Sequence, residues 1–407
     1  MGALKLATPG LSGQRPRRVV LYSHDTFGLG HLRRSRALAS ALTQSGTAGS
    51  AIILTGSPVA GRFTFPRAVD HLRLPGVKKL ADGSYVSQNS GMDLEATTSL
   101  REGLISSTIA QYDPDLLIVD KEPTGFRGEL LPTLEALRQE GRTRVVLGLR
   151  DVLDEPEVLA SEWERKGALG AAEKYYDELW VYGPRSVYDP TQGLPLSDDV
   201  RARTHWTGYL RRAIIDPADV PDTPYILVTP GGGGDGEAMV DLVLTAYEQD
   251  PDLAPHAVLV YGPFLSGDTR DAFEARVAAL DGRVTATGFD SRIESLFAGA
   301  QGVICMGGYN TFCEVLSFDQ RAVIVPRTKP RLEQWIRANR AEELGLVRNL
   351  DEFRDGLTPQ SMIAAIRALP HQNRPSQAGA DGLLDGLDVV IERAAALMRS
   401  TLIDAAE

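Results

Sequence analysis

A glycine-rich turn near the N-terminus carries the first side chain that could do chemistry. In the stretch Gly28-Leu29-Gly30-His31 a histidine stands at the expected start of a helix. A helix N-terminus lowers the pKa of an imidazole, and a neutral imidazole is what a general base needs. His31 is therefore the first candidate for a catalytic base, although a histidine in a first helical turn is often only structural.

An acidic residue at the end of an apolar run could assist that histidine. Asp120 ends the run Leu116–Asp120 (LLIVD), which predicts a buried strand. A carboxylate can orient an imidazole, as in catalytic triads, and the alternatives for Asp120 are helix capping or a hydrogen bond between domains. Asp25 and Glu122 are reserve candidates for the base.

A second glycine turn lies in the latter half of the chain. The apolar run Gly302–Met306 predicts a strand, Gly307 and Gly308 follow it, and apolar residues then recur at helical spacing. Glycines let a ligand approach the backbone, and a helix start offers unpaired N–H groups at the positive end of a dipole. This order of elements predicts a phosphate site.

Thr311 and Glu314 form a T-x-x-E pair in the same region. The pair has two interpretations that overlap. It is either a capping box, in which Glu314 accepts from the Thr311 N–H, or a site where Glu314 accepts the hydroxyls of a ribose.

A further glycine loop, Pro230–Gly236, follows a predicted strand and precedes a predicted helix. It matches the G-x-G-x-x-G fingerprint, but the next strand ends at Tyr261 without the acid that a dinucleotide needs, and no phosphate-binding G-x-x-x-x-G-K-[ST] occurs. We expect Gly232, Gly233 and Gly234 to cradle a diphosphate through their backbone. A flexible turn is the alternative.

The segment 302–340 resembles the donor half of GT-B glycosyltransferases. The shared pattern is GGYNTFCE, then AVIVPR, then EQxxxAN. It is similar above all to the MurG-like group and to related bacterial predicted glycosyltransferases of unknown substrate. The resemblance implies that the glycine turn and helix hold a nucleotide diphosphate, that a glutamate binds the ribose and that a glutamine contacts the sugar. These roles fall on Gly308, Tyr309, Asn310, Thr311, Glu314 and Gln334.

Other positions take roles from the same resemblance. It covers most of residues 19–400 and implies that Phe289, Asp290 and Ile293 lie near the nucleobase, although Asp290 could simply cap a helix. It also implies that the histidine of the first glycine loop acts at the acceptor. Arg327, directly after a strand, is a candidate partner for phosphate or an acidic sugar. The family usually has Ser-Gly where this chain has two glycines.

The expected fold class is α/β, of the GT-B type, with two Rossmann-like domains facing across a cleft. The chain has 407 residues, enough for two domains or three. We expect a disordered lead-in at 1–18, an acceptor domain at 19–212, a nucleotide-sugar donor domain at 223–385, and a helix at 386–407 that crosses back to the first domain. The segment 73–92 lacks clear periodicity and is expected to be a mobile acceptor loop.

The net charge, the apolar runs and the cysteine content limit the classes of partner that this chain can have. The net charge of −11 argues against nucleic acid, and no apolar run is long enough to span a membrane. The only two cysteines, Cys305 and Cys313, are expected to be buried free thiols in a reducing cytoplasm. The acceptor is left open as a small molecule, a lipid-linked molecule or a polymer, and peripheral contact with the inner face of the membrane stays open as well.

The sequence therefore predicts a metal-independent inverting glycosyltransferase. Its donor is a nucleotide-diphosphate sugar, with a UDP-sugar favoured, acting as co-substrate with no further cofactor. No suitable D-x-D metal motif occurs. The alternatives are a non-hydrolysing UDP-sugar 2-epimerase of the same fold and a non-catalytic nucleotide-sugar-binding protein.

Overall fold

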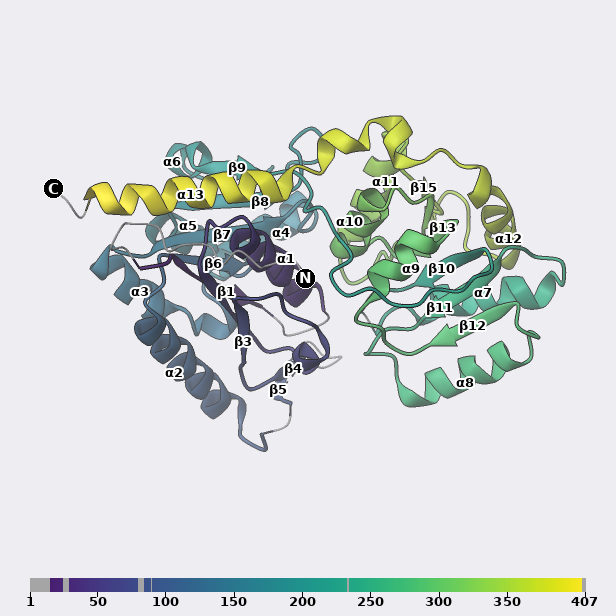
Figure 1. The fold of residues 1–407 in the computed structure, drawn as a ribbon, viewed down its shortest axis with the longest axis horizontal. Coiled ribbons are helices and arrows are strands. Elements are labelled where there is room, and N and C mark those ends of the chain that lie inside the picture. The colour runs from purple at the N-terminus through teal and green to yellow at the C-terminus, as the bar shows by residue number, and fades with distance from the viewer. Residues whose placement is uncertain (1–14, 25–28, 80–83, 89, 233, 405–407) are drawn as a thin grey trace, which may run out of the picture.

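The computed structural model describes residues 15–24, 29–79, 84–88, 90–232 and 234–404. Figure 1 shows two α/β halves side by side. Most of the predicted lead-in, the reserve base Asp25 and the loop glycine Gly233 lie outside the described residues.

The first half is built on a seven-stranded sheet in the order β3-β2-β1-β6-β7-β8-β9, in which every neighbouring pair is parallel. Its strands are β1 (Arg18–Ser23), β2 (Ser50–Thr55), β3 (Val69–Arg73), β6 (Leu116–Asp120), β7 (Arg144–Arg150), β8 (Glu178–Tyr182) and β9 (Thr204–Trp206).

The second half is built on a six-stranded parallel sheet in the order β12-β11-β10-β13-β14-β15. Its strands are β10 (Tyr225–Thr229), β11 (His256–Val260), β12 (Val284–Thr287), β13 (Gly302–Cys305), β14 (Ala322–Ile324) and β15 (Arg348–Asn349).

Helices connect the strands, as parallel sheets require. The long apolar strands are buried throughout, which explains why β6 and β10 read as continuous apolar runs rather than as alternating ones. None of the helices among the described residues has the length and apolar character needed to cross a membrane. The α-helices are α1 (Gly30–Gln44), α2 (Leu94–Tyr112), α3 (Leu131–Glu140), α4 (Pro156–Arg165), α5 (Ala168–Tyr175), α6 (Asp198–Ala202), α7 (Glu237–Gln249), α8 (Gly267–Ala278), α9 (Ile293–Gly299), α10 (Tyr309–Ser317), α11 (Glu333–Glu343), α12 (Pro359–Ala368) and α13 (Gly386–Asp404).

The segment 73–92 is more regular than expected. It contains two short strands, β4 (Val77–Lys79) and β5 (Tyr85–Ser87), which pair in antiparallel fashion with Val77 opposite Ser87. Each strand has three residues, too few for an alternating pattern to stand out in the sequence. The role of this segment as a mobile acceptor loop stays a prediction.

The order of strands determines where a ligand can bind. In each sheet the chain reverses its direction of winding beside the first strand, between β1 and β6 in one half and between β10 and β13 in the other. Open α/β sheets bind ligands at such switch points, beyond the carboxyl ends of the strands. His31 follows β1, Asp120 ends β6, and the two glycine turns follow β10 and β13.

The last helix belongs spatially to the first half. In Figure 1 α13, in yellow, runs across the half that contains β7 and β8, and Arg393 on this helix pairs with Glu178 of β8. The chain crosses back where a Cβ on Gly386 would lie 2.4 Å from the Gly208 carbonyl oxygen. Only glycine allows the two crossing segments to approach this closely.

Candidate active site

A cavity of about 180 Å³ lies between the two switch points. Both halves of the chain contribute to its lining. The predicted site residues that line it are His31, Gly232, Phe289, Asp290, Ile293, Gly308, Tyr309, Asn310, Thr311, Glu314, Arg327 and Gln334. Of the other predicted residues that the structure describes, Gly234 packs toward the Phe264 carbonyl and Asp120 lies behind His31, so neither lines the cavity.

His31 and Asp120 meet on the wall formed by the first half. The Nδ1 atom of His31 lies 2.7 Å from Oδ2 of Asp120. Burial opposes ionisation of Asp120, but the Arg34 guanidinium and His31 outweigh it and hold the Asp120 pKa below its ordinary value. Because Asp120 is then an acceptor only, Nδ1 of His31 carries the proton, and Nε2 is left with its lone pair.

The protonation state of His31 follows from its surroundings. Burial lowers the pKa of His31 to about 4, and the neighbouring Asp120 carboxylate only partly offsets this effect. His31 is therefore neutral at physiological pH. A neutral imidazole that lines a cavity and has a fixed tautomer can accept a proton from a substrate hydroxyl.

Sequence reasoning missed Arg34, the third member of this group. Arg34 is 1% exposed, and its Nη2 lies 2.5 and 2.6 Å from the two carboxylate oxygens of Asp120. It follows His31 by three positions, so both side chains lie on one face of α1. That spacing was visible in the sequence, but the partner of Arg34 was not.

Glu122, a reserve candidate for the base, does not line the cavity. Burial opposes its ionisation, but Lys121, His24 and Lys166 together lower its pKa to about 2. Lys166 lies 2.9 Å from its carboxylate. So weak a base is a poor proton acceptor at neutral pH.

On the wall formed by the second half, α10 begins at the cavity. Its N-cap is Gly308, and no side chain caps it. The capping-box interpretation of Thr311 and Glu314 is therefore wrong, because the helix starts three residues earlier than that interpretation requires. The uncapped end leaves the amide groups of the first turn for a ligand.

The backbone conformation of this turn explains why its first residue is a glycine. Gly307 has φ of +71°, and a Cβ there would lie 2.6 Å from a methyl carbon of Ile324. The position therefore excludes the serine that the family usually has.

Glu314 lies one turn into α10 and is 1% exposed. Arg33, from the first half, pairs with Oε1 of Glu314 and also with Glu294 at 3.0 Å. Oε2 of Glu314 is buried and has no hydrogen-bond partner among the described residues. Burial raises the pKa of Glu314 to about 7, although Arg33 opposes the rise. Buried unsatisfied oxygens are rare in folded proteins, so Oε2 marks a place where a ligand could bind.

Asn310 lines the cavity, but its side chain is occupied in joining the two halves. Its Nδ2 donates to the Gly30 carbonyl at 2.9 Å, and its Oδ1 accepts from Arg212 at 2.6 Å. Two arginines in or just before α11 also join the halves. Arg337 binds Asp151 through two hydrogen bonds, and Arg331 pairs with Glu162 at 2.8 Å.

Two aromatic residues, Phe63 and Phe289, line the cavity together with Ile293. The Phe289 ring contacts Phe63 edge to face at 5.8 Å between centroids, and the Arg62 guanidinium lies 5.8 Å from the Phe289 centroid. Asp290 accepts from the Arg292 backbone amide at 2.8 Å. Phe63 belongs to the first half, and nothing in its local sequence predicted this contact.

Arg327 and Gln334 also line the cavity and lie together. The Arg327 amide donates to Oε1 of Gln334 at 3.2 Å, and its guanidinium pairs with Asp235 at 2.5 Å and Glu333 at 2.6 Å. Oε2 of Glu333 is buried without a partner among the described residues. Glu333 lines the cavity next to Gln334 and was missed by the sequence analysis.

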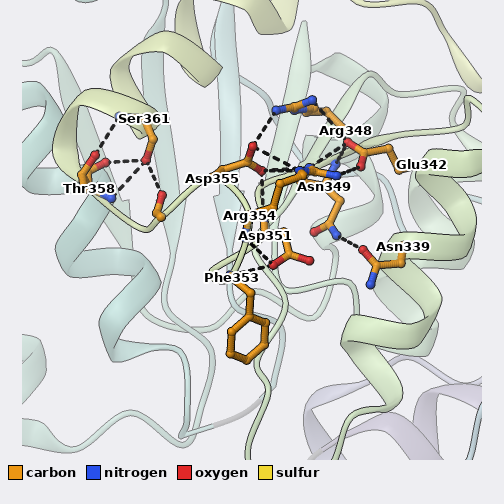
Figure 2. A network of polar contacts seen from close by, with 11 residues as sticks. Asn339, Glu342, Arg348, Asn349, Asp351, Phe353, Arg354, Asp355, Thr358 and Ser361 are labelled. Carbon is orange, nitrogen blue, oxygen red and sulfur yellow. Dashed lines mark hydrogen bonds and ion pairs between the residues drawn. The ribbon is translucent and has the colours of Figure 1, made fainter.

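A polar network fastens α11, the helix that presents Glu333 and Gln334. Figure 2 shows Asn349 bound to Asn339, and Arg354 bound to Glu342 and to the residues of its own turn. Asp351 also accepts from the Trp335 indole at 2.8 Å. The same figure shows the capping box of α12, formed by Thr358 and Ser361.

Comparisons with known proteins place the fold. No protein-family model and no curated protein sequence matches the chain. Among solved structures, TcCGT1 in complex with UDP is similar with a TM-score of 0.65 and 14% identity, covering 95% of this chain and 100% of that chain. A UDP-glucosyltransferase from Polygonum tinctorium has a TM-score of 0.59 and 13% identity, covering 95% and 100%. A glycosyltransferase from Rickettsia africae has a TM-score of 0.58 and 11% identity, covering 96% of this chain and 99% of that chain.

The chain thus has the GT-B fold of glycosyltransferases, with two parallel-sheet α/β domains, and the expected fold class is confirmed. A structure of MurG from Acinetobacter baumannii is also similar, with a TM-score of 0.49 and 16% identity, covering 90% of this chain and 99% of that chain. Identities this low establish the fold, and the chemistry must be argued from the cavity.

Proposed function

We propose that this protein transfers a sugar from a nucleotide-diphosphate donor, with UDP-sugars favoured, to an acceptor hydroxyl. One observation carries the proposal. A single cavity brings together the neutral His31 from one half, and the uncapped start of α10 with the unsatisfied Glu314 carboxylate oxygen from the other half.

The donor is proposed to lie along the second half. The backbone of Gly232 and the start of α10 would hold the diphosphate, and Glu314 would accept the ribose hydroxyls. The nucleobase would lie beside Phe289 and Ile293, and the sugar beside Gln334. All of these residues line the one cavity, which supports this arrangement.

The chemistry proposed is a single displacement with inversion and without a metal ion. The acceptor hydroxyl gives its proton to Nε2 of His31 as its oxygen forms a bond to the anomeric carbon. The bond from that carbon to the β-phosphate oxygen breaks, and the nucleoside diphosphate leaves with both electrons. The dipole of α10 and the glycine backbone stabilise the charge that develops on the leaving group.

A donor-binding experiment tests the proposal. Calorimetric titration with UDP, GDP, dTDP and ADP should show micromolar binding of at least one nucleotide, and Glu314→Gln should weaken it about 10- to 100-fold, because hydrogen bonds to a charged group contribute about 1.5–3 kcal/mol. Glu294→Gln is the matched control, since Glu294 also pairs with Arg33 but does not line the cavity. Binding that is absent, or weakened equally by both changes, would reject the proposed donor site.

A turnover experiment separates the alternatives. With UDP-glucose and a panel of sugar, lipid-linked and polymer acceptors, we expect UDP release and a product of inverted anomeric configuration by proton NMR. Conversion of UDP-N-acetylglucosamine to an epimer without any acceptor would favour the epimerase. Nucleotide binding without turnover of any donor would favour a binding protein. The proposed site of action is the cytoplasm, including the inner membrane face if the acceptor is lipid-linked.

A further inference from the structure

Arg150 differs from the other arginines of the cavity. Four arginines line it, and three of them are held by carboxylates: Arg33 by Glu294 and Glu314, Arg34 by Asp120, and Arg327 by Asp235 and Glu333. The side chain of Arg150 makes no hydrogen bond or ion pair with any residue that the structure describes, whereas its backbone is part of strand β7. Its Nε is buried and unsatisfied.

The carboxylates near Arg150 form ion pairs with other arginines. Asp151 and Asp154, which follow Arg150 in the chain, are bound by Arg337 and Arg331. Glu333 is the carboxylate that most favours the charge on Arg150, but Arg327 holds it at 2.6 Å. Each of these three carboxylates has another arginine as its partner, while Oε2 of Glu333 has no hydrogen-bond partner among the described residues.

An unpaired guanidinium in this position is costly. Burial and the neighbouring Arg34 and Arg337 lower the pKa of Arg150, while Glu333 acts in the opposite direction. A guanidinium nevertheless keeps its proton in proteins, so the positive charge remains at the cavity wall. Charges with buried atoms are normally paired, and the Arg150 side chain has no partner among the described residues, so an anion bound in the cavity is a suitable partner.

The position of Arg150 indicates which part of a substrate it would meet. It ends β7, the strand next to β6, and Asp120 of β6 stands opposite Gly148 of β7. Arg150 thus lies at the carboxyl end of β7, in the half that carries His31. The charged groups that act on it are Glu333, Arg34, Arg337 and Asp151, whereas Glu314 is acted on by Arg33, Glu294 and Arg212. Arg150 therefore shares its surroundings with Arg34, which binds Asp120 beside His31, rather than with Glu314.

We propose that Arg150 binds an acidic group on the acceptor, a carboxylate or a phosphate close to the hydroxyl that His31 deprotonates. The planar guanidinium can donate two parallel hydrogen bonds to either anion. The assignment rests on the proposed glycosyl transfer, and it selects acidic sugars and sugar phosphates over neutral acceptors of the same shape.

Binding measurements on the UDP-saturated protein test this assignment. Glucuronate and glucose 6-phosphate serve as the acidic probes, and glucose serves as the neutral one. We expect at least one acidic probe to bind at least tenfold more tightly than glucose to the wild type, and the probe that does so identifies carboxylate or phosphate. In Arg150→Gln this preference should be lost, while the affinity for UDP stays within about threefold.

Thermal unfolding without ligand provides the second readout. Arg150→Gln should have a Tm equal to or above that of the wild type, because the change removes an uncompensated charge. The matched control Arg327→Gln should lower the Tm, because it leaves Asp235 and Glu333 without their partner.

Four results would overturn the assignment. They are equal binding of acidic and neutral probes to the wild type, binding of neither, a Tm for Arg150→Gln that falls as far as that of Arg327→Gln, and a loss of UDP affinity in Arg150→Gln. The last result would make Arg150 a ligand of the donor diphosphate. If UDP fails to bind the wild type at all, the proposed function fails instead, so the two failures are distinguishable.

Discussion

Replacing Asp120 by asparagine tests the geometry around His31 most directly. The Asp120 carboxylate can only accept, which fixes the proton on Nδ1 of His31 at 2.7 Å. An asparagine can instead donate its amide N–H to Nδ1. The proton of His31 would then move to Nε2, and the lone pair that should receive the acceptor proton would be lost.

The expected fall in kcat follows from the loss of general base catalysis by His31. General base catalysis contributes about 10²- to 10⁴-fold, so kcat should fall in that range, while the affinity for UDP should stay within about threefold. The change also leaves Arg34, which is 1% exposed, without its carboxylate. Breaking a buried pair from one side costs about 3–5 kcal/mol, so the free energy of unfolding should fall as well.

The assay must separate catalysis from stability. Nitrogen-15 NMR of labelled histidine should show the His31 proton on Nδ1 in the wild type and on Nε2 in Asp120→Asn. Asp154→Asn is the control, because Asp154 pairs with Arg331 at 3.4 Å and does not line the cavity. It should leave the His31 tautomer and kcat unchanged. An unchanged tautomer and kcat in a folded Asp120→Asn protein would refute the assignment of His31 as the base.

Three further predictions concern stability. Burial lowers the His31 pKa from 6.5 to about 4, so the unfolded state binds more protons between these values, and His31 should cost the wild type about 2 kcal/mol between pH 8 and pH 5. Denaturant unfolding at both pH values measures the free energy of unfolding lost between pH 8 and pH 5. That loss should be about 2 kcal/mol smaller in His31→Gln than in the wild type, and an equal loss in both proteins would contradict the lowered pKa. Gly307→Ala should lower the free energy of unfolding by about 2 kcal/mol or more, because φ is +71° and the new Cβ meets Ile324. Urea titration measures this change, and Gly308→Ala is the control because a Cβ at Gly308 has open space. Asp351→Ala should cost about 1–3 kcal/mol, because it leaves the Trp335 indole unsatisfied, and the unfolding midpoint measures it; a change below about 0.5 kcal/mol would show that the turn does not depend on this contact.

The sequence located the long strands well. The runs Leu116–Asp120 and Tyr225–Thr229 form β6 and β10 with the predicted bounds, because their apolar side chains are buried on both faces of a parallel sheet. Strands of two or three residues, such as β4, β5 and β15, carry too little pattern to be predicted.

Helix starts were less certain, and one error changed an interpretation. The T-x-x-E pattern at Thr311 suggested a capping box, but α10 begins at Tyr309, because Gly307 turns the chain at positive φ and Gly308 takes the capping position. The start of a helix depends on the backbone of the turn before it, which a side-chain pattern alone does not reveal.

The sequence by itself determined the fold class, the glycine turns and the residue types that could act in the site, because these depend on local patterns of apolar, glycine and polar residues. Only the tertiary structure decided which charges are paired. His31 and Asp120 are separated by 89 positions, and Arg33 and Glu314 by 281. Whether a charge has a partner depends on every residue that packs around it, so only the tertiary structure shows that the Arg150 side chain has no partner among the described residues.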